Sequence, residues 1–151
     1  FYKDWRLKSA SLRYFTVYGP RQRPDMGFHK FLRAILLGRP LDVYGDGGQS
    51  RDCTFVADVV AATIQAGDTR TKSRVFNVGG GTRRALAEVL EVMEEIVGKR
   101  AIVRYTPPER GDVLHTHAEI SKSRAEFGYN PLTPLEEGLR HEARWLQESL
   151  G

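Results

Sequence analysis

One segment, residues 11–26 (SLRYFTVYGPRQRPDM), constrains the fold of this chain more than any other. Its first half is rich in β-branched and aromatic residues, with polar residues interspersed, which predicts a strand. Glycine and proline at residues 18–20 predict a turn, and Arg21 and Arg23 follow it directly. In open α/β sheets, ligands bind beyond the carboxyl ends of strands. The segment therefore predicts either an anion-binding loop or a plain turn with two solvated arginines.

The rest of the chain alternates between helical and extended hydrophobic patterns, which is typical of an α/β fold. We expect helices at residues 1–8, 27–37, 58–66, 82–97, 121–127 and 133–146, and strands at residues 11–18, 41–44, 53–56, 74–78 and 101–105. The helix at 58–66 is rich in alanine and valine and is expected to be buried. Thr82 and Ser121 are expected to cap their helices, and residues 133–136 form a capping box with Pro134 at the first helical position.

Composition narrows the class of protein. A chain of 151 residues with 40% hydrophobic and 28% charged residues is enough for one globular domain with a core. No stretch approaches about 18 apolar residues, so we expect no membrane partner. Cys53 is the only cysteine, which excludes a disulfide framework and a thiolate metal site and fits the cytoplasm. The rest of the sequence shows no metal-binding pattern. The net charge of +4 favours an anionic ligand, and scattered basic residues favour a small phosphate compound over nucleic acid.

Five stretches of the sequence together resemble one known enzyme family. They are, in chain order, LRYFTVYGPRQRPDM, YGDGGQSRD, FNVGGG, PERGD and NPLTPLEEGL. In wording and order they resemble the NAD-dependent epimerase/dehydratase family of extended short-chain dehydrogenases/reductases, and most of all UDP-glucose and UDP-glucuronate 4-epimerases. The resemblance is to the C-terminal half of such enzymes. It implies an α/β fold in which the last strands of a Rossmann-like sheet join a small, mixed α/β substrate-binding domain.

The resemblance also implies a division of the chain. Residues 1–20 would be the last part of the NAD-binding domain, and residues 21–151 would be mainly the nucleotide-sugar domain, with a strand near 74–79 returning to the first. The N-terminal Rossmann half would be a separate partner, and the complete enzyme would be a homodimer.

A UDP-sugar carries a diphosphate, which guanidinium groups bind bidentately, and a ribose diol, which suits a carboxylate. By resemblance, the substrate-binding residues are Thr16, Arg23, Lys30, Val43, Tyr44, Arg51, Arg110 and Asp112. Tyr18 and Pro20 would approach the nicotinamide of NAD. Arg51 and Arg110 would bind the diphosphate, Asp112 would lie near the ribose, and the backbone of the strand at 41–44 would pair with uracil.

Three of these roles have a structural alternative. Arg51 could instead pair on the surface with Asp46 or Asp52. The stretch PERGD could be only a turn capped by its own aspartate. Lys30, placed near the sugar C6 group, could be an ordinary solvated lysine.

Two features of catalysis are absent from this sequence. No tyrosine is followed four positions later by lysine, which is the family's acid–base pair. The glycine run at 79–81 lacks the G-x-G-x-x-G spacing of a dinucleotide loop, so we interpret it as a structural turn. We therefore expect no catalytic residue in this chain and no turnover by the chain alone. Alternatives are a dehydratase or decarboxylase of the same family, a non-catalytic nucleotide-sugar-binding module, and a nucleic-acid-binding protein.

Overall fold

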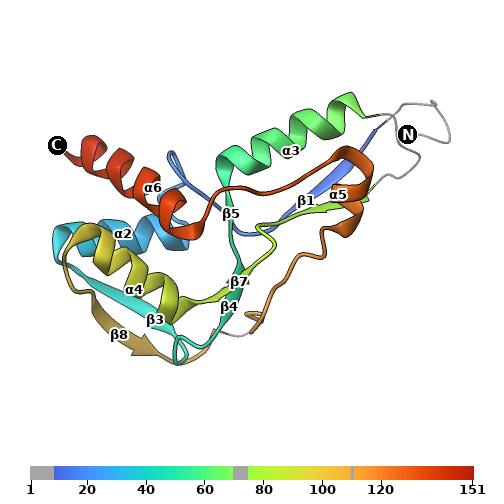
Figure 1. Ribbon diagram of the computed structural model, residues 1–151. Coiled ribbons are helices and arrows are strands. Elements are labelled where there is room, and N and C mark those ends of the chain that lie inside the picture. Colours follow the sequence, from blue (N-terminus) through green and yellow to red (C-terminus); the bar gives the residue numbers. More distant parts are fainter. Residues whose placement is uncertain (1–8, 70–74, 110) are drawn as a thin grey trace.

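The computed structural model describes residues 9–69, 75–109 and 111–151, and the expected helix at 1–8 lies outside these ranges. The described residues form an α/β fold (Figure 1). Its helices are α2 (Gly27–Leu37), α3 (Val56–Asp68), α4 (Leu86–Val97), α5 (Ser121–Phe127) and α6 (Leu135–Leu150). Its strands are β1 (Ser11–Tyr14), β2 (Val17–Tyr18), β3 (Pro40–Tyr44), β4 (Ser50–Asp52), β5 (Thr54–Phe55), β6 (Val75–Val78), β7 (Arg83–Ala85) and β8 (Ile102–Thr106).

The strands associate in pairs. β1 runs parallel to β6, β2 to β5 and β3 to β8, whereas β4 and β7 are antiparallel. In the first pair, Ser11 lies opposite Val75 and Tyr14 opposite Val78. β6 therefore lies beside β1, while the division into two domains at residue 20, with a strand near 74–79 returning to the first, stays a prediction.

The expected continuous strand at 11–18 is broken in the middle. Thr16 has a φ of 20°, and the chain on either side of it pairs with different strands. The Phe15 amide donates to the Val78 carbonyl of β6 at 3.0 Å, whereas the Thr54 amide donates to the Thr16 carbonyl at 3.1 Å. The chain thus changes partner at Phe15–Thr16, because β6 ends there and β5 begins to supply the next hydrogen bonds.

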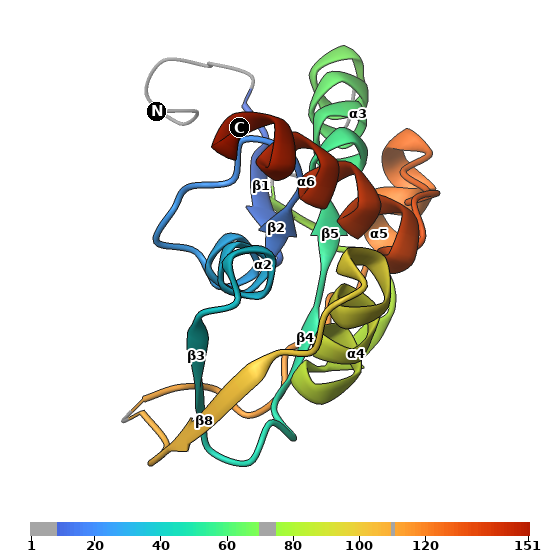
Figure 2. The same cartoon turned by 90° about the vertical axis from the view of Figure 1, so that its left-hand side faces the viewer.

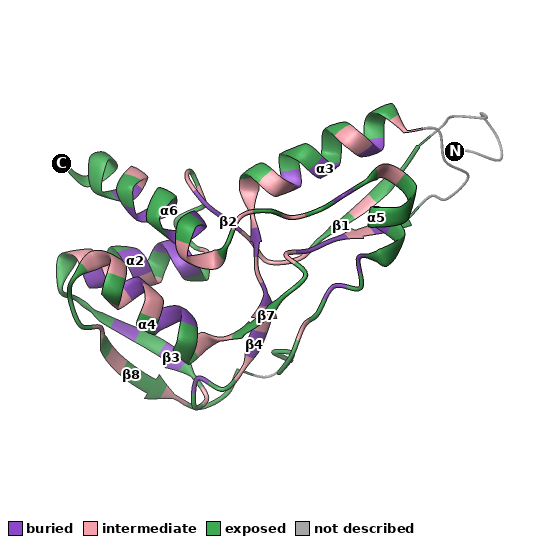
Figure 3. Ribbon diagram, in the orientation of Figure 1, coloured by how far each residue is buried: buried purple, intermediate pink, exposed green. Residues whose placement is uncertain are grey.

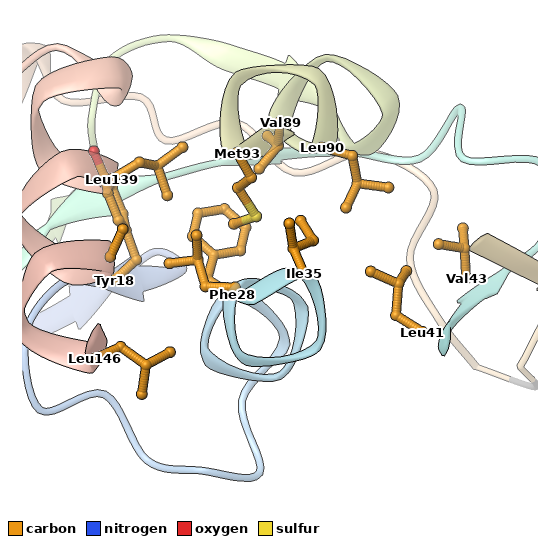
Figure 4. Packing of buried hydrophobic residues seen from close by; sticks show 12 residues of the cluster. Tyr18, Phe28, Ile35, Leu41, Val43, Val89, Leu90, Met93, Leu139 and Leu146 are labelled. Atoms are coloured by element: carbon orange, nitrogen blue, oxygen red, sulfur yellow. The ribbon is translucent and has the colours of Figure 1, made fainter. Parts of the chain in front are cut away.

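The larger core lies between α2, α4 and α6, which gather on one side of the β3–β8 pair (Figures 1 and 2). Figure 4 shows Phe28 and Ile35 of α2 pointing toward Met93 of α4 and Leu139 of α6. Helical spacing places Phe28, Leu32 and Ile35 on one face of α2, and all are buried. The amphipathic helix expected at 27–37 is confirmed, and Gly38 ends it.

A second, smaller core lies around the β1–β6 pair. It contains Val59 and Ala62 of α3, Val78 of β6, and the residues Ala118, Ile120 and Tyr129 near α5. The expectation that the third helix is buried is wrong, since Val60 and Ile64 on its other face are 53% and 61% exposed. In Figure 3, exposed stretches alternate with buried ones along α3. An alanine- and valine-rich composition did not reveal which face of α3 lacks a neighbour among the described residues.

Two expected helix starts are also wrong. Thr82 does not cap α4, because β7 follows it and pairs with β4, and the helix begins at Leu86. Ser121 is the first residue of α5 rather than its cap, and its amide donates to Glu119 Oε1 at 2.8 Å. A strand made of two arginines and an alanine carries little β propensity, so the pairing of β7 had no local signal.

The last helix begins one residue later than expected. α6 starts at Leu135, with Pro134 as the flanking residue and no hydrogen bond from a capping side chain. The amide of Thr133 donates instead to Asp58 Oδ2 of α3 at 3.2 Å. A tertiary contact to α3 has therefore replaced the local capping box. The expected inward face of α6 is confirmed at Leu139, Ala143 and Leu146.

Candidate ligand-binding site

A cavity of about 290 Å³ lies at the carboxyl end of β2, where ligands bind in open α/β sheets. It is lined by Val17, Tyr18, Gly19, Pro20, Arg21, Gln22, Arg23, Met26 and Val56. Three predicted site residues, Tyr18, Pro20 and Arg23, thus share one cavity. The Tyr18 ring itself is buried against Phe28 and Phe55, so its contact with a cofactor stays a prediction.

The loop around this cavity is held at both ends by Gln22, which the sequence patterns did not single out. Its Nε2 donates to the Val17 carbonyl at 2.9 Å, and its Oε1 accepts from the His29 amide at 2.8 Å. The Gln22 amide also donates to the Gly19 carbonyl, closing the turn. One side chain therefore ties the loop to β2 and to α2.

Arg23 lies on the outer wall of the cavity, with its side chain 74% exposed. Its Nε and Nη2 donate to the two carboxylate oxygens of Asp25, and this pairing lowers the pKa of Asp25. Exposed ion pairs contribute little to stability, so an incoming anion can compete for the guanidinium. Lys30 is exposed one turn into α2, and its charge also acts on Asp25. Thr16 lies at the break between β1 and β2.

A second predicted group forms around Arg51 of β4. Its Nη2 donates to Asp112 Oδ1 at 2.5 Å, and its Nη1 donates to the Leu114 carbonyl at 3.2 Å. Two predicted site residues 61 positions apart are therefore in direct contact. The alternative pairing of Arg51 with Asp46 or Asp52 is wrong. Arg110, the other predicted diphosphate ligand, lies outside the described residues.

Asp52 lies next to Arg51 but turns the other way, into the interior, where it is fully buried. Its Oδ1 accepts from the Gly80 amide at 2.6 Å and its Oδ2 from the Ala118 amide at 3.0 Å. A Cβ on Gly80 would lie 2.1 Å from the Cys53 carbonyl oxygen, so only glycine fits. The glycine run at 79–81 is accordingly a structural turn packed on β4 rather than a phosphate-binding loop.

β3 carries the predicted uracil contact. Val43 is buried and Tyr44 is 49% exposed, and they lie opposite Tyr105 and Thr106 of β8. Among the described residues, no strand pairs with the other edge of β3. In a parallel pair, part of the backbone hydrogen-bonding capacity points away from the partner strand. That edge of β3 is thus open among the described residues, although the Tyr44 carbonyl already accepts from Gln49 Nε2 at 2.9 Å.

The two groups are joined by one extended segment. β4 holds Arg51, and β5, three residues later at Thr54, pairs with Val17 at the cavity. Three residues of extended chain span about 10 Å. The Arg51–Asp112 pair and the cavity thus lie at opposite ends of this extended segment, and Cys53 lies between the two ends. Burial raises the pKa of the Cys53 thiol to about 12, which makes it a poor nucleophile.

Glu142 of α6 was missed from the sequence. It is fully buried behind the cavity, where its Oε2 accepts from the Gly19 amide at 2.8 Å. Burial raises the pKa of its carboxyl to about 7. A signal was present, because position 142 falls between Leu139 and Leu146 on the inward stripe of the helix, where a charged residue is unusual.

Comparison with known proteins identifies the family. The family model described as "NAD dependent epimerase/dehydratase family" matches residues 2–79, just over half of the chain. This chain belongs to the NAD-dependent epimerase/dehydratase family. Membership confirms the family expected from the five motifs, and with it the expected α/β fold class.

Relatives in this family match almost the whole chain. The UDP-glucuronate 4-epimerase of Thermodesulfobacterium geofontis is 36% identical over 145 residues, covering 95% of this chain and 45% of the relative. The structure of UDP-glucuronic acid 4-epimerase from Bacillus cereus, in complex with UDP-glucuronic acid and NAD, has a TM-score of 0.94 and 35% identity. It matches 98% of this chain and 48% of its own length.

A third match is the structure of UDP-glucose 4-epimerase from Thermotoga maritima with UDP-glucose, at a TM-score of 0.94 and 33% identity over 99% of this chain. This chain spans less than half the length of each of these three relatives.

Among its described residues, no helix has the length and apolar character needed to cross a membrane. Nor do those residues contain a cluster of three or more metal-ligating side chains.

Proposed function

We propose that this chain is the nucleotide-sugar-binding part of an NAD-dependent UDP-sugar 4-epimerase acting on UDP-glucose or UDP-glucuronate. The observation that carries the proposal is the match of 98% of the chain to an epimerase solved with UDP-glucuronic acid and NAD. The contact between Arg51 and Asp112 supports it, since both had been assigned to the same ligand from separate motifs.

In this proposal Arg51 binds the diphosphate together with Arg110. Guanidinium groups form bidentate, charge-assisted hydrogen bonds to phosphate oxygens. Arg51 is oriented for this role because the Leu114 carbonyl and Asp112 already hold its two terminal nitrogens. Asp112 accepts from the ribose diol, and the free edge of β3 at Val43 and Tyr44 pairs with uracil.

The sugar then extends along β4 and β5 into the cavity at the end of β2. Arg23 and Lys30 provide positive charge on its outer side, which suits a uronate carboxylate or a phosphate oxygen. Thr16 lies at the strand break beside the cavity and offers a hydroxyl. Pro20 and Tyr18 form the part of the wall that faces the nicotinamide.

Bound NAD would supply the hydride exchange at C4 of the sugar that inverts this carbon. The residues of this chain bind and orient the substrate for that exchange. The described glycine turn at 79–81 packs against Asp52 and does not form a dinucleotide site. A Rossmann half supplied outside this chain therefore provides the main NAD site and the acid–base pair, in a cytoplasmic homodimer.

Calorimetric titration of this chain with UDP tests the proposal. We expect measurable binding to the unaltered chain and at least about tenfold weaker binding to Arg51→Ala, because a charge-assisted pair to phosphate is removed. Arg144→Ala is the matched control, since Arg144 forms an exposed ion pair with Glu148 on α6 and should leave UDP binding unchanged.

Two results would contradict the proposal. One is equal loss of affinity in both arginine variants, which would indicate a general charge effect. The other is binding to single-stranded nucleic acid with a steep salt dependence and no preference for UDP. We also expect no conversion of UDP-glucose to UDP-galactose by this chain alone.

A further inference from the structure

The buried carboxyl of Glu142 has no role in the function proposed above, yet it contacts the wall of the cavity. We propose that Glu142 is a positioning residue, which fixes the Gly19 turn and thereby the part of the cavity that receives the sugar. Glu142 does this through the backbone and does not itself line the cavity. The inference rests on the proposed function, because it concerns how tightly the sugar is held.

Glu142 and Gly19 are far apart in the sequence but form a direct hydrogen bond in the structure. Glu142 Oε2 lies 2.8 Å from the Gly19 nitrogen, 123 positions away in the chain. Glu142 is fully buried, and its Oε1 has no hydrogen-bond partner among the described residues. Burying a carboxyl with only one partner is costly, which is hard to explain if packing alone selected this side chain.

Gly19 needs an external anchor because its backbone is unusual. Its φ is +134°, and a Cβ at this position would lie 2.7 Å from a methyl group of Val56 and 3.0 Å from the Phe55 ring. The turn is thus packed tightly against Phe55 of β5 and Val56 at the start of α3. Since Tyr18, Gly19 and Pro20 all line the cavity, a shift of the Gly19 amide changes the cavity wall.

The titratable groups near Glu142 come from several elements. On β2 and α2 they are Tyr18, whose hydroxyl donates to the Leu135 carbonyl, and His29, whose ring contacts Trp145. The other titratable side chains on α6 and on the elements packed against it, which are α2, α4 and the start of α3, are Lys30, Arg33, Asp58, Glu88, Glu91, Glu94, Glu95, Glu136, Glu137, Arg140, His141, Arg144 and Glu148. None of them forms a hydrogen bond with Glu142 Oε1.

Comparing UDP with UDP-glucuronate by calorimetry isolates the sugar contribution. The ratio of the two affinities measures what the sugar adds beyond the nucleotide. In Glu142→Leu we expect this ratio to fall about tenfold, because the Gly19 amide loses its acceptor, while the UDP affinity stays the same. At pH 6, Glu142→Gln should keep the ratio, since its amide oxygen can accept the same hydrogen bond as the neutral carboxyl. Glu137→Gln, an exposed change on the same helix, is the control.

A pH series provides a second test that does not depend on the leucine variant folding. A carboxylate accepts a hydrogen bond more strongly than a neutral carboxyl or amide. The affinity ratio of the unaltered chain should therefore rise by about threefold from pH 6 to pH 8. The ratio of Glu142→Gln should not change over this range. A ratio with the same pH dependence in both proteins overturns the proposal.

Amide hydrogen exchange tests the anchor without any ligand. We expect the Gly19 amide to be protected in the unaltered chain and in Glu142→Gln, and to exchange rapidly in Glu142→Leu while the amides of β6 stay protected. Unchanged protection of Gly19 in the leucine variant overturns the role of Glu142. Absence of UDP binding by the unaltered chain, with Gly19 behaving as expected, would instead count against the proposed function.

Discussion

At the scale of single residues, two buried carboxyls organise this molecule in different ways. Asp52 accepts from two backbone amides, those of Gly80 and Ala118, and so connects three segments of chain. Glu142 accepts only from Gly19, and one of its oxygens has no partner among the described residues. A fully hydrogen-bonded carboxylate is compatible with burial, whereas an under-satisfied one is costly when charged. Burial accordingly raises the pKa of the Glu142 carboxyl to about 7.

We predict that Glu142→Gln removes a pH dependence of stability. The folded state raises the pKa of Glu142 from 4.5 to about 7. This carboxyl therefore contributes stability below pH 4.5 that is lost as the pH rises through 7. The free energy of unfolding of Glu142→Gln, minus that of the unaltered chain, should rise by about 3 kcal/mol from pH 4.5 to pH 8. Urea denaturation at several pH values measures this difference, and a constant difference would contradict the prediction.

At the scale of elements, the positions of the helices are set by close approaches as much as by propensity. α6 crosses β2 at Gly138, where a Cβ would lie 2.3 Å from the Tyr18 hydroxyl. α3 has a glycine too, Gly67, but no atom of the described residues beyond its own stretch of helix lies within 4 Å of where its Cβ would be. Glycine weakens a helix interior through its backbone entropy. One of these two glycines is therefore needed for packing and the other is not.

We predict opposite effects of the same substitution at these two sites. Gly67→Ala should raise the free energy of unfolding by about 0.5–1 kcal/mol, because alanine favours the helix and meets no neighbour among the described residues. Gly138→Ala should lower it by about 1–3 kcal/mol, because the methyl group forces α6 away from Tyr18. Thermal denaturation of both variants measures these two changes in the free energy of unfolding. Stabilisation by Gly138→Ala would mean that α6 does not pack on β2 in this way.

At the scale of the whole molecule, the face of α3 that points away from the smaller core is left without cover among the described residues. Val60 and Ile64 are exposed one turn apart on α3, and Tyr14 of β1 reaches the same helix through a 2.9 Å hydrogen bond between its hydroxyl and Thr63. Exposed apolar residues grouped on a helix mark an interaction surface. In the proposed enzyme, this surface would face the Rossmann half.

We predict that this chain self-associates through α3 when it is studied alone. Ile64→Lys should shift sedimentation-velocity profiles toward the monomer, because it places a charge within the apolar patch. Ile102→Lys is the control, since Ile102 is 52% exposed on β8, away from α3. Equal effects of the two substitutions would indicate nonspecific association through apolar residues generally.

The sequence by itself determined the family, the α/β class and the better-patterned elements. The helix at 27–37 was predictable to the residue, because hydrophobic spacing and a terminal glycine are local signals. Motif resemblance chose Arg51 and Asp112 separately, and the structure brings them into contact. Local pattern could not reveal β7, whose formation depends on pairing with β4.

Tertiary structure alone decided how the candidate site is held together. The break at Thr16, the clamp made by Gln22 and the bond from Gly19 to Glu142 all join segments that local pattern does not relate. The physical reason is that a hydrogen bond between distant residues depends on how helices and strands pack. Spacing along the chain encodes which face of an element is apolar, but not which buried carboxyl meets which amide.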